Sequence, residues 1–78
     1  MKDSLNIAIA GATGYVGLEL LNLLLKHPKA KIKYLCATKS IGKHIKYFNK
    51  DIKKKNLPVI SKINNIDWNK IDIIFTAL

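Results

Sequence analysis

The sequence predicts an α/β fold with an open parallel sheet, of which these 78 residues are expected to be the N-terminal portion. Three observations lead to this class. Short apolar runs of strand length alternate with one longer segment of helical periodicity. Three glycines at intervals of three separate the first run from the helical segment. A second strand-like run completes a strand–helix–strand unit within the first 37 residues, and the strands of such a unit are parallel.

The first strand is expected at residues 5–10, an apolar run that a single asparagine interrupts. The helix is expected at residues 15–26, where apolar side chains cover most of the helical surface and the polar ones form one narrow stripe. A helix this apolar should be covered on more than one side. Pro28 ends it, because proline breaks the helical hydrogen bonding and restricts the residue before it.

The second strand is expected in "KIKYLCAT", residues 31–38. Side chains alternate between the two faces of a strand. By this alternation Ile32, Tyr34 and Cys36 should share one face of the sheet, and Leu35 should lie on the other.

The rest of the chain has a weaker pattern. Residues 39–56 are rich in lysine and read as a loop with a short helical turn, and residues 57–60 could form a third strand. Asp67 could cap a short turn that Trp68 would anchor on the sheet. The closing run "DIIFTAL", residues 72–78, is a strong fourth strand.

The three glycines sit where a strand turns sharply into a helix. Gly11 would supply unusual backbone angles, Gly14 would let a ligand approach the backbone, and Gly17 would let helix and strand pack closely. The first turn of the helix offers free N–H groups at the positive end of its dipole, and the Thr13 hydroxyl could join them. This is the pyrophosphate cradle of a Rossmann-type dinucleotide-binding sheet, although the spacing is GxxGxxG and not GxGxxG.

The end of the second strand distinguishes the two nicotinamide dinucleotides. Enzymes that prefer NAD often carry Asp or Glu there, whereas this chain has Thr38, Lys39 and Ser40. A cation between two hydroxyls suits a ribose 2′-phosphate, so NADP is the expected cofactor. The expected cofactor-binding residues are Gly11, Ala12, Thr13, Gly14, Tyr15, Val16, Gly17, Thr38, Lys39, Ser40 and Leu78.

Catalytic and metal-binding groups are not evident in the sequence. Cys36 is expected to be inert packing in a strand beneath the cofactor layer, and no nucleophile–base pair or metal-ligand spacing is visible. As the single cysteine, it excludes an internal disulfide. The absence of a secretory leader and of an apolar run of about 18 residues predicts a cytoplasmic protein that does not enter a membrane.

The net charge of +9 comes from fourteen lysines and no arginine, against five acids. A dedicated nucleic-acid binder would use arginine, whose fork reads phosphate and guanine bidentately. Lysine, isoleucine and asparagine are all abundant, as AT-rich codons would produce. We therefore interpret the charge mainly as a solvated surface, with no nucleic acid as partner. A non-enzymatic basic interaction module stays open as an alternative and would need its lysines on one face.

The stretch "GATGYVGLELLNLLLKHP" resembles the opening of N-acetyl-gamma-glutamyl-phosphate reductases, relatives of aspartate-semialdehyde dehydrogenase in arginine biosynthesis. "ATKS", the following Gly42-Lys43 and the closing "DIIFTAL" are also similar to that family. The resemblance covers essentially all 78 residues and is thin only from 44 to 66. Lysine stands at position 39, where the family commonly has arginine.

The resemblance implies an oxidoreductase that uses NADPH to reduce an acyl phosphate to an aldehyde through a cysteine thioester, with a histidine as acid/base. Both catalytic residues lie far downstream in the family, in a second domain. Residues 1–78 are therefore expected to be a partial NADP-binding domain, truncated before the catalytic domain and inactive alone. The parent enzyme is expected to be a homo-oligomer.

Two related enzymatic or cofactor-binding alternatives stay open beside this one. Aspartate-semialdehyde dehydrogenase is a near neighbour, although Tyr15 and "LLLKHP" fit the glutamyl-phosphate branch better. An atypical short-chain dehydrogenase or an NADP-sensing protein can also carry "GATGYVG". That group usually has an aspartate after the third strand, and "PVISKINN" offers none.

Overall fold

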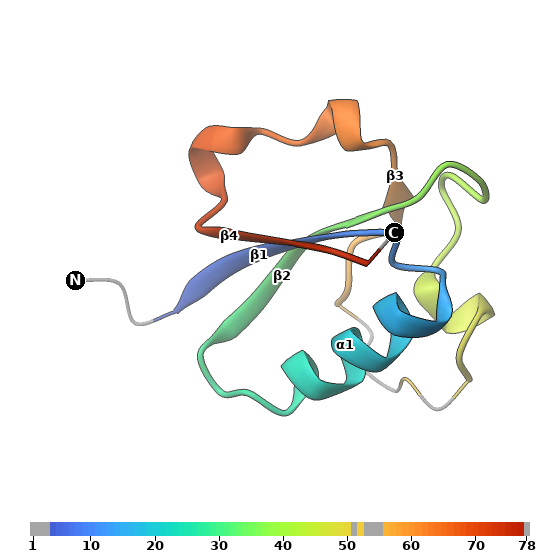
Figure 1. Cartoon of the computed structure of the whole chain (residues 1–78), viewed down its shortest axis with the longest axis horizontal. Coiled ribbons are helices and arrows are strands. Elements are labelled where there is room, and N and C mark those ends of the chain that lie inside the picture. The colour runs from blue at the N-terminus through green and yellow to red at the C-terminus, as the bar shows by residue number, and fades with distance from the viewer. Residues whose placement is uncertain (1–3, 51, 53–55, 78) are drawn as a thin grey trace.

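The computed structural model describes residues 4–50, 52 and 56–77. Its four strands form one sheet of order β3-β2-β1-β4 in which every pair of neighbours is parallel (Figure 1). This confirms the expected α/β class with an open parallel sheet. The elements are β1 Leu5–Ala10, α1 Tyr15–Leu25, β2 Ala30–Cys36, the 3₁₀-helix η1 Ile45–Tyr47, β3 Ile60–Ser61, the 3₁₀-helices η2 Ile63–Asn65 and η3 Trp68–Lys70, and β4 Ile73–Thr76.

Different segments cover the two faces of the sheet. On one face, α1 and the chain between β2 and β3 build the larger core around Ile9, Leu21 and Leu35, which are fully buried. On the other face, the segment between β3 and β4 packs Ile66 and Ile71 over the sheet (Figure 1). The carboxyl ends of the strands lie between these two layers, and this placement positions the site described below.

A bulge in β2 changes which residues share a face. Ile7 of β1 pairs with Ile32, but the next residue, Ala8, pairs with Tyr34, so Lys33 has no partner in β1. The extra residue reverses the alternation from that point on. Ile32 therefore shares the helix-covered core with Leu35, while Tyr34 and Cys36 lie with the smaller cluster on the opposite face. The expectation that Ile32, Tyr34 and Cys36 share one face was wrong for this reason.

Three strand boundaries also differ from expectation. β2 ends at Cys36, two residues before the expected end, because the chain turns away beside β3. β3 comprises only Ile60–Ser61, so most of the expected third strand at 57–60 is not in the sheet. β4 spans Ile73–Thr76 inside the expected 72–78, where position 78 lies outside the described residues.

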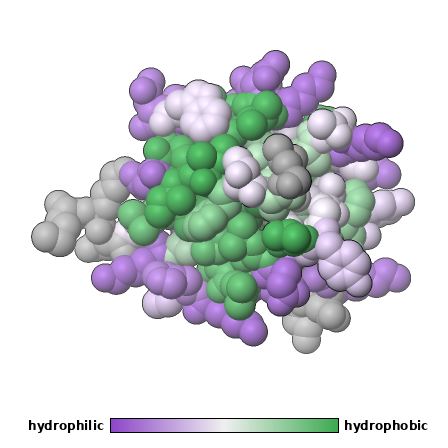
Figure 2. All heavy atoms as spheres, in the orientation of Figure 1, coloured by the Kyte–Doolittle hydropathy of each residue, from purple (hydrophilic) through white to green (hydrophobic). Residues whose placement is uncertain are grey.

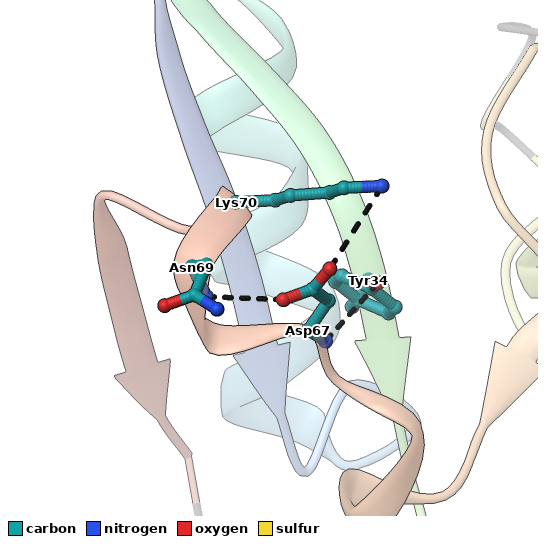
Figure 3. A network of polar contacts seen from close by, with 4 residues as sticks. All are labelled: Tyr34, Asp67, Asn69 and Lys70. Atoms are coloured by element: carbon teal, nitrogen blue, oxygen red, sulfur yellow. Dashed lines mark hydrogen bonds and ion pairs between the residues drawn. The ribbon is translucent and has the colours of Figure 1, made fainter.

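The tyrosine that the bulge turns outward holds the covering segment in place. The Tyr34 hydroxyl accepts a hydrogen bond from the Asp67 backbone N–H at 3.2 Å (Figure 3). The Asp67 carboxylate then accepts from the Asn69 N–H at 3.2 Å, which confirms the expected cap, and lies 3.8 Å from the Lys70 ammonium. Trp68 is 55% exposed, so its expected anchoring role was wrong. Ile66 and Ile71 pack over the sheet in its stead.

The surface of the chain mixes the two kinds of side chain. Figure 2 shows apolar side chains across the middle of one face and hydrophilic ones around its rim. Within the described residues, no helix has the length and apolar character needed to cross a membrane.

Candidate functional site

The turn from β1 into α1 is held by backbone hydrogen bonds to the neighbouring strand. The N–H groups of Gly11 and Ala12 both donate to the Cys36 carbonyl, at 2.9 and 3.0 Å. Gly11 has a φ of 82°, in the left-handed region where a side chain is strained, so glycine is needed at this turn. The turn therefore joins the carboxyl ends of β1 and β2 and presents the start of α1 at that edge.

Gly17 and Gly14 have different roles in this turn. A β-carbon on Gly17 would collide with the Gly11 carbonyl and would lie 2.8 Å from the Ala12 Cα, so the close packing expected of Gly17 is present. A β-carbon on Gly14 would meet only the Gly11 carbonyl oxygen, at an ordinary 3.6 Å. Its φ of −78° is open to any residue. Within the described chain, nothing sterically requires glycine at position 14, which leaves open space before the helix.

The start of α1 offers donors without a competing anion. Gly14 is the N-cap and receives no side-chain hydrogen bond, and the first turn contains no acidic residue. The N–H groups of the first helical positions have no acceptor within a helix, and they lie at the positive end of the helix dipole. Tyr15 and Val16 are 95% and 66% exposed, so this helix start faces solvent. Its chemistry suits a phosphate or pyrophosphate.

A cavity of about 420 Å³ lies beside this turn at the carboxyl ends of the strands. Its lining residues are Ala10, Gly11, Thr13, Cys36, Ala37, Thr38, Lys62, Ile63 and Asn64. The structure thus brings together three of the expected site residues, Gly11, Thr13 and Thr38. The other expected residues of 11–17 form the turn and the first helical turn, and Leu78 lies outside the described residues.

The loop after β2 is tied to β3. The Gly42 N–H donates to the Ile60 carbonyl at 2.7 Å, and the Ile60 N–H donates back to the Lys43 carbonyl at 2.8 Å. Ser40 adopts a φ of 64°, which is uncommon for a residue with a side chain, and its carbonyl accepts from the Lys43 N–H. Thr38, Lys39 and Ser40 therefore follow the carboxyl end of β2, with Thr38 at the cavity and Lys39 exposed.

Cys36 lies in the cavity wall, and the expectation that it would sit beneath the cofactor layer was wrong. It is the last residue of β2, because the strand ends earlier than alternation and length suggested. Its side chain is buried, with the sulfur 3.9 Å from the Ser61 hydroxyl oxygen. Burial raises the pKa of the Cys36 thiol, and the Ser61 hydrogen bond lowers it by less. A buried, protonated thiol is a poor nucleophile, which agrees with an inert role.

The cavity also contains residues that the sequence did not indicate. Lys62, Ile63 and Asn64 form the wall that follows β3. The sequence placed the third strand at 57–60, which puts its carboxyl end before Ser61. The pairing of Cys36 with Ser61 brings Lys62 to the sheet edge, and this pairing is a long-range property that no local pattern reports. Among the described residues, no group of three or more histidine, cysteine or acidic side chains is placed to hold a metal ion.

Open parallel sheets bind nucleotides outside the carboxyl ends of their strands, with the phosphates at the N-terminus of the helix after the first strand. The cavity and the uncapped start of α1 meet at that location, which defines a dinucleotide-binding α/β domain. The chain belongs to the semialdehyde dehydrogenase family, since residues 6–78 match the family described as "Semialdehyde dehydrogenase, NAD binding domain". Its cofactor class is accordingly a nicotinamide dinucleotide.

The relatives have one printed name. The chain is 49% identical over 79 residues to the N-acetyl-gamma-glutamyl-phosphate reductase of Ehrlichia ruminantium (strain Gardel), and 38% identical over 78 residues to that of Rhodospirillum rubrum. Both matches cover 100% of this chain but only 23% and 22% of the relatives. The chain thus spans about a quarter of the length of the curated relatives it matches. The resemblance found in the sequence is confirmed.

A solved structure supports the same family. The crystal structure of aspartate semialdehyde dehydrogenase with NADP from Candida albicans superposes with a TM-score of 0.75 at 29% identity. The match covers 96% of this chain and 23% of that one.

Proposed function

We propose that this chain is the NADP-binding part of an oxidoreductase that reduces N-acetyl-glutamyl phosphate to its semialdehyde in arginine biosynthesis. The observation that carries the cofactor part is the open space at Gly14 before an uncapped helix start, in a turn whose other close contact, at Gly17, is filled by the chain itself. The substrate part is supported by the printed names of the relatives that match the whole chain.

The residues of the turn fit a dinucleotide pyrophosphate. The N–H groups of Tyr15, Val16 and Gly17 and the hydroxyl of Thr13 would hold it, with the Ala12 backbone shaping the turn and Gly14 leaving room. The cavity beside them would take the adenosine half. A nicotinamide dinucleotide supplies the hydride for reduction when it is bound. Leu78 stays a predicted contact outside the described residues.

Several features support NADP over NAD. Thr38, Lys39 and Ser40 follow β2 at the position where an acid would bind an unmodified ribose. A carboxylate there would repel a 2′-phosphate, whereas an ammonium group attracts it. The Candida albicans neighbour was solved with NADP, in agreement with this choice.

The acyl phosphate substrate, the downstream catalytic cysteine and histidine, and a homo-oligomeric parent enzyme all belong to this proposal. They follow from the resemblance of the chain to its named relatives. Cys36 is not the catalytic group in this proposal, because it is buried and its pKa is raised.

Aspartate semialdehyde dehydrogenase is the second candidate, which the Candida albicans neighbour favours. Its 29% identity is well below the 49% of the Ehrlichia reductase. A basic interaction module has less support, because the hydrophilic side chains in Figure 2 lie around the rim of that face and do not gather in one patch.

A chimera tests the proposal. Residues 1–78 replace the matching segment of the Ehrlichia ruminantium relative, and phosphate- and NADP-dependent oxidation of the two semialdehydes is measured in the reverse direction. We expect turnover of N-acetyl-glutamate semialdehyde above that of aspartate semialdehyde. Turnover with NAD but not NADP would refute the cofactor part. A chimera that folds but is inactive with either cofactor, while the unmodified relative is active, would refute the proposal as a whole.

A further inference from the structure

Lys62 is placed at the cavity by the pairing of β3 with β2. Cys36 pairs with Ser61, and the Ala37 N–H donates to the Ser61 carbonyl at 3.1 Å. Neighbouring strands lie about 5 Å apart, so the residue after Ser61 leaves the sheet directly beside the end of β2. Lys62 and Thr38 accordingly line the same cavity from adjacent strand ends.

The backbone at Lys62 is held in position. Lys62 is the N-cap residue of η2, and its carbonyl accepts a hydrogen bond from the Asn65 N–H at 3.0 Å. Its side chain therefore starts from a backbone fixed on one side by the sheet and on the other by a helical turn. Its reach is limited to the cavity and the adjacent solvent.

Lys62 is the single charged residue among the described residues that line this cavity. The other lining residues are apolar or carry neutral hydroxyl, thiol and amide groups. Within the described part of the chain, no carboxylate forms an ion pair with Lys62. A cation at a largely apolar cavity attracts an anion more strongly than one in open water, because the local dielectric constant is lower.

Lys39 differs from Lys62 in this respect. Lys39 is exposed in the loop and is not among the residues that line the cavity. The sequence indicated Lys39 as the cation of the phosphate site, because it follows the second strand directly. The structure adds a cation from a different strand end, and this one borders the space that the adenosine half would fill.

We propose that Lys62 is a second ligand of the ribose 2′-phosphate and the residue that contributes most to the preference for the phosphorylated dinucleotide. This inference rests on the proposed binding of NADP at the cavity. It assigns to the β3–η2 junction a part in specificity that Thr38, Lys39 and Ser40 would otherwise have alone.

The experiment compares Lys62→Gln and Lys62→Arg with a control, Lys29→Gln, which removes the same charge from the opposite end of the sheet. Calorimetry measures the Kd of the 78-residue chain for NADP, NAD and 2′,5′-ADP. Thermal unfolding checks that each variant is folded. A charged hydrogen bond is worth roughly 1.5–3 kcal/mol, which corresponds to a loss of about 10- to 150-fold.

We expect Lys62→Gln to weaken NADP and 2′,5′-ADP by about that factor, with NAD changed less than about threefold. Lys62→Arg should keep most of the affinity, and Lys29→Gln should change none of the three. Equal losses for NADP and NAD, or no loss in Lys62→Gln while Lys39→Ala weakens NADP, would overturn the role of Lys62 and leave the proposed function standing. A wild-type chain that is folded but binds none of the three ligands would overturn both.

Discussion

Gly17 faces the Gly11 carbonyl so closely that a β-carbon at position 17 would overlap it and would lie 2.8 Å from the Ala12 Cα. The first turn of α1 therefore packs directly on the backbone of the turn that precedes it. Glycine at this position is a packing requirement of the chain itself, while glycine at position 14 has no such cause among the described residues.

Gly17→Ala should lower the free energy of unfolding by about 1–3 kcal/mol, because overlap with backbone atoms can be relieved only by moving the helix. The sign is informative, since alanine is favoured over glycine by about 1 kcal/mol inside a helix. Denaturant unfolding of the two proteins measures the change. Gly14→Ala is the matched control and should cost less than about 1 kcal/mol. Equal stability of Gly17→Ala and wild type would contradict the contact.

Gly14→Val should abolish dinucleotide binding and leave the fold intact. The backbone at position 14 has φ −78° and ψ 170°, an extended conformation that valine adopts readily. The branched side chain would then occupy the space before the helix N–H groups. Fluorescence or calorimetric titration with NADP provides the measurement. A folded Gly14→Val protein with wild-type affinity would show that the pyrophosphate lies elsewhere.

Lys39→Ala should weaken NADP by about 1.5–3 kcal/mol if its ammonium group forms a charged hydrogen bond with the 2′-phosphate. NAD lacks that phosphate, so its affinity should hardly change. The ratio of kcat/KM for the two cofactors in the chimera described above measures the preference. A preference for NAD in the unmodified chimera would contradict this assignment at the outset.

The alkaline stability of the chain should depend on Cys36. Burial raises the pKa of this thiol, so the unfolded chain loses the proton first as pH rises. The group has no effect on stability well below the ordinary thiol pKa of about 8.5. Above it, the free energy of unfolding falls until pH passes the raised pKa of the folded state.

Cys36→Ala lacks this term, so the stability difference between wild type and variant should shrink between about pH 7 and pH 10. Tyrosine and lysine titrations are shared by both proteins and cancel in the difference. Urea unfolding at several pH values supplies the data. A difference that stays constant over this range would mean that the thiol is not buried as described.

Local patterns in the sequence predicted much of the fold. The residues of β1 and α1 follow from an apolar run, a helical period and the glycines between them, and their boundaries differ from expectation by at most one residue. Gly11 and Gly17 were also assigned correct roles, because positive φ and close approach each leave glycine as the remaining choice.

The parts that were missed depend on pairing between distant residues. Lys33 has the same alternating neighbours as any strand residue, and only pairing with β1 leaves it without a partner. The position of Lys62 depends in the same way on the pairing of Cys36 with Ser61. The left-handed backbone of Ser40 is set by hydrogen bonds around the loop and not by a turn-forming residue at that position.

The unpaired Lys33 in β2 makes insertions and deletions at this point unlike substitutions. Removing Lys33 would restore regular alternation and turn every later residue of the strand to the opposite side. Leu35 would leave the helix-covered core for the cavity side, and Cys36 would move from the cavity wall toward α1. The Tyr34 hydroxyl would also lose Asp67. A single-residue deletion would thus rearrange core, cavity and covering segment together, while replacement of the exposed Lys33 side chain would disturb none of them.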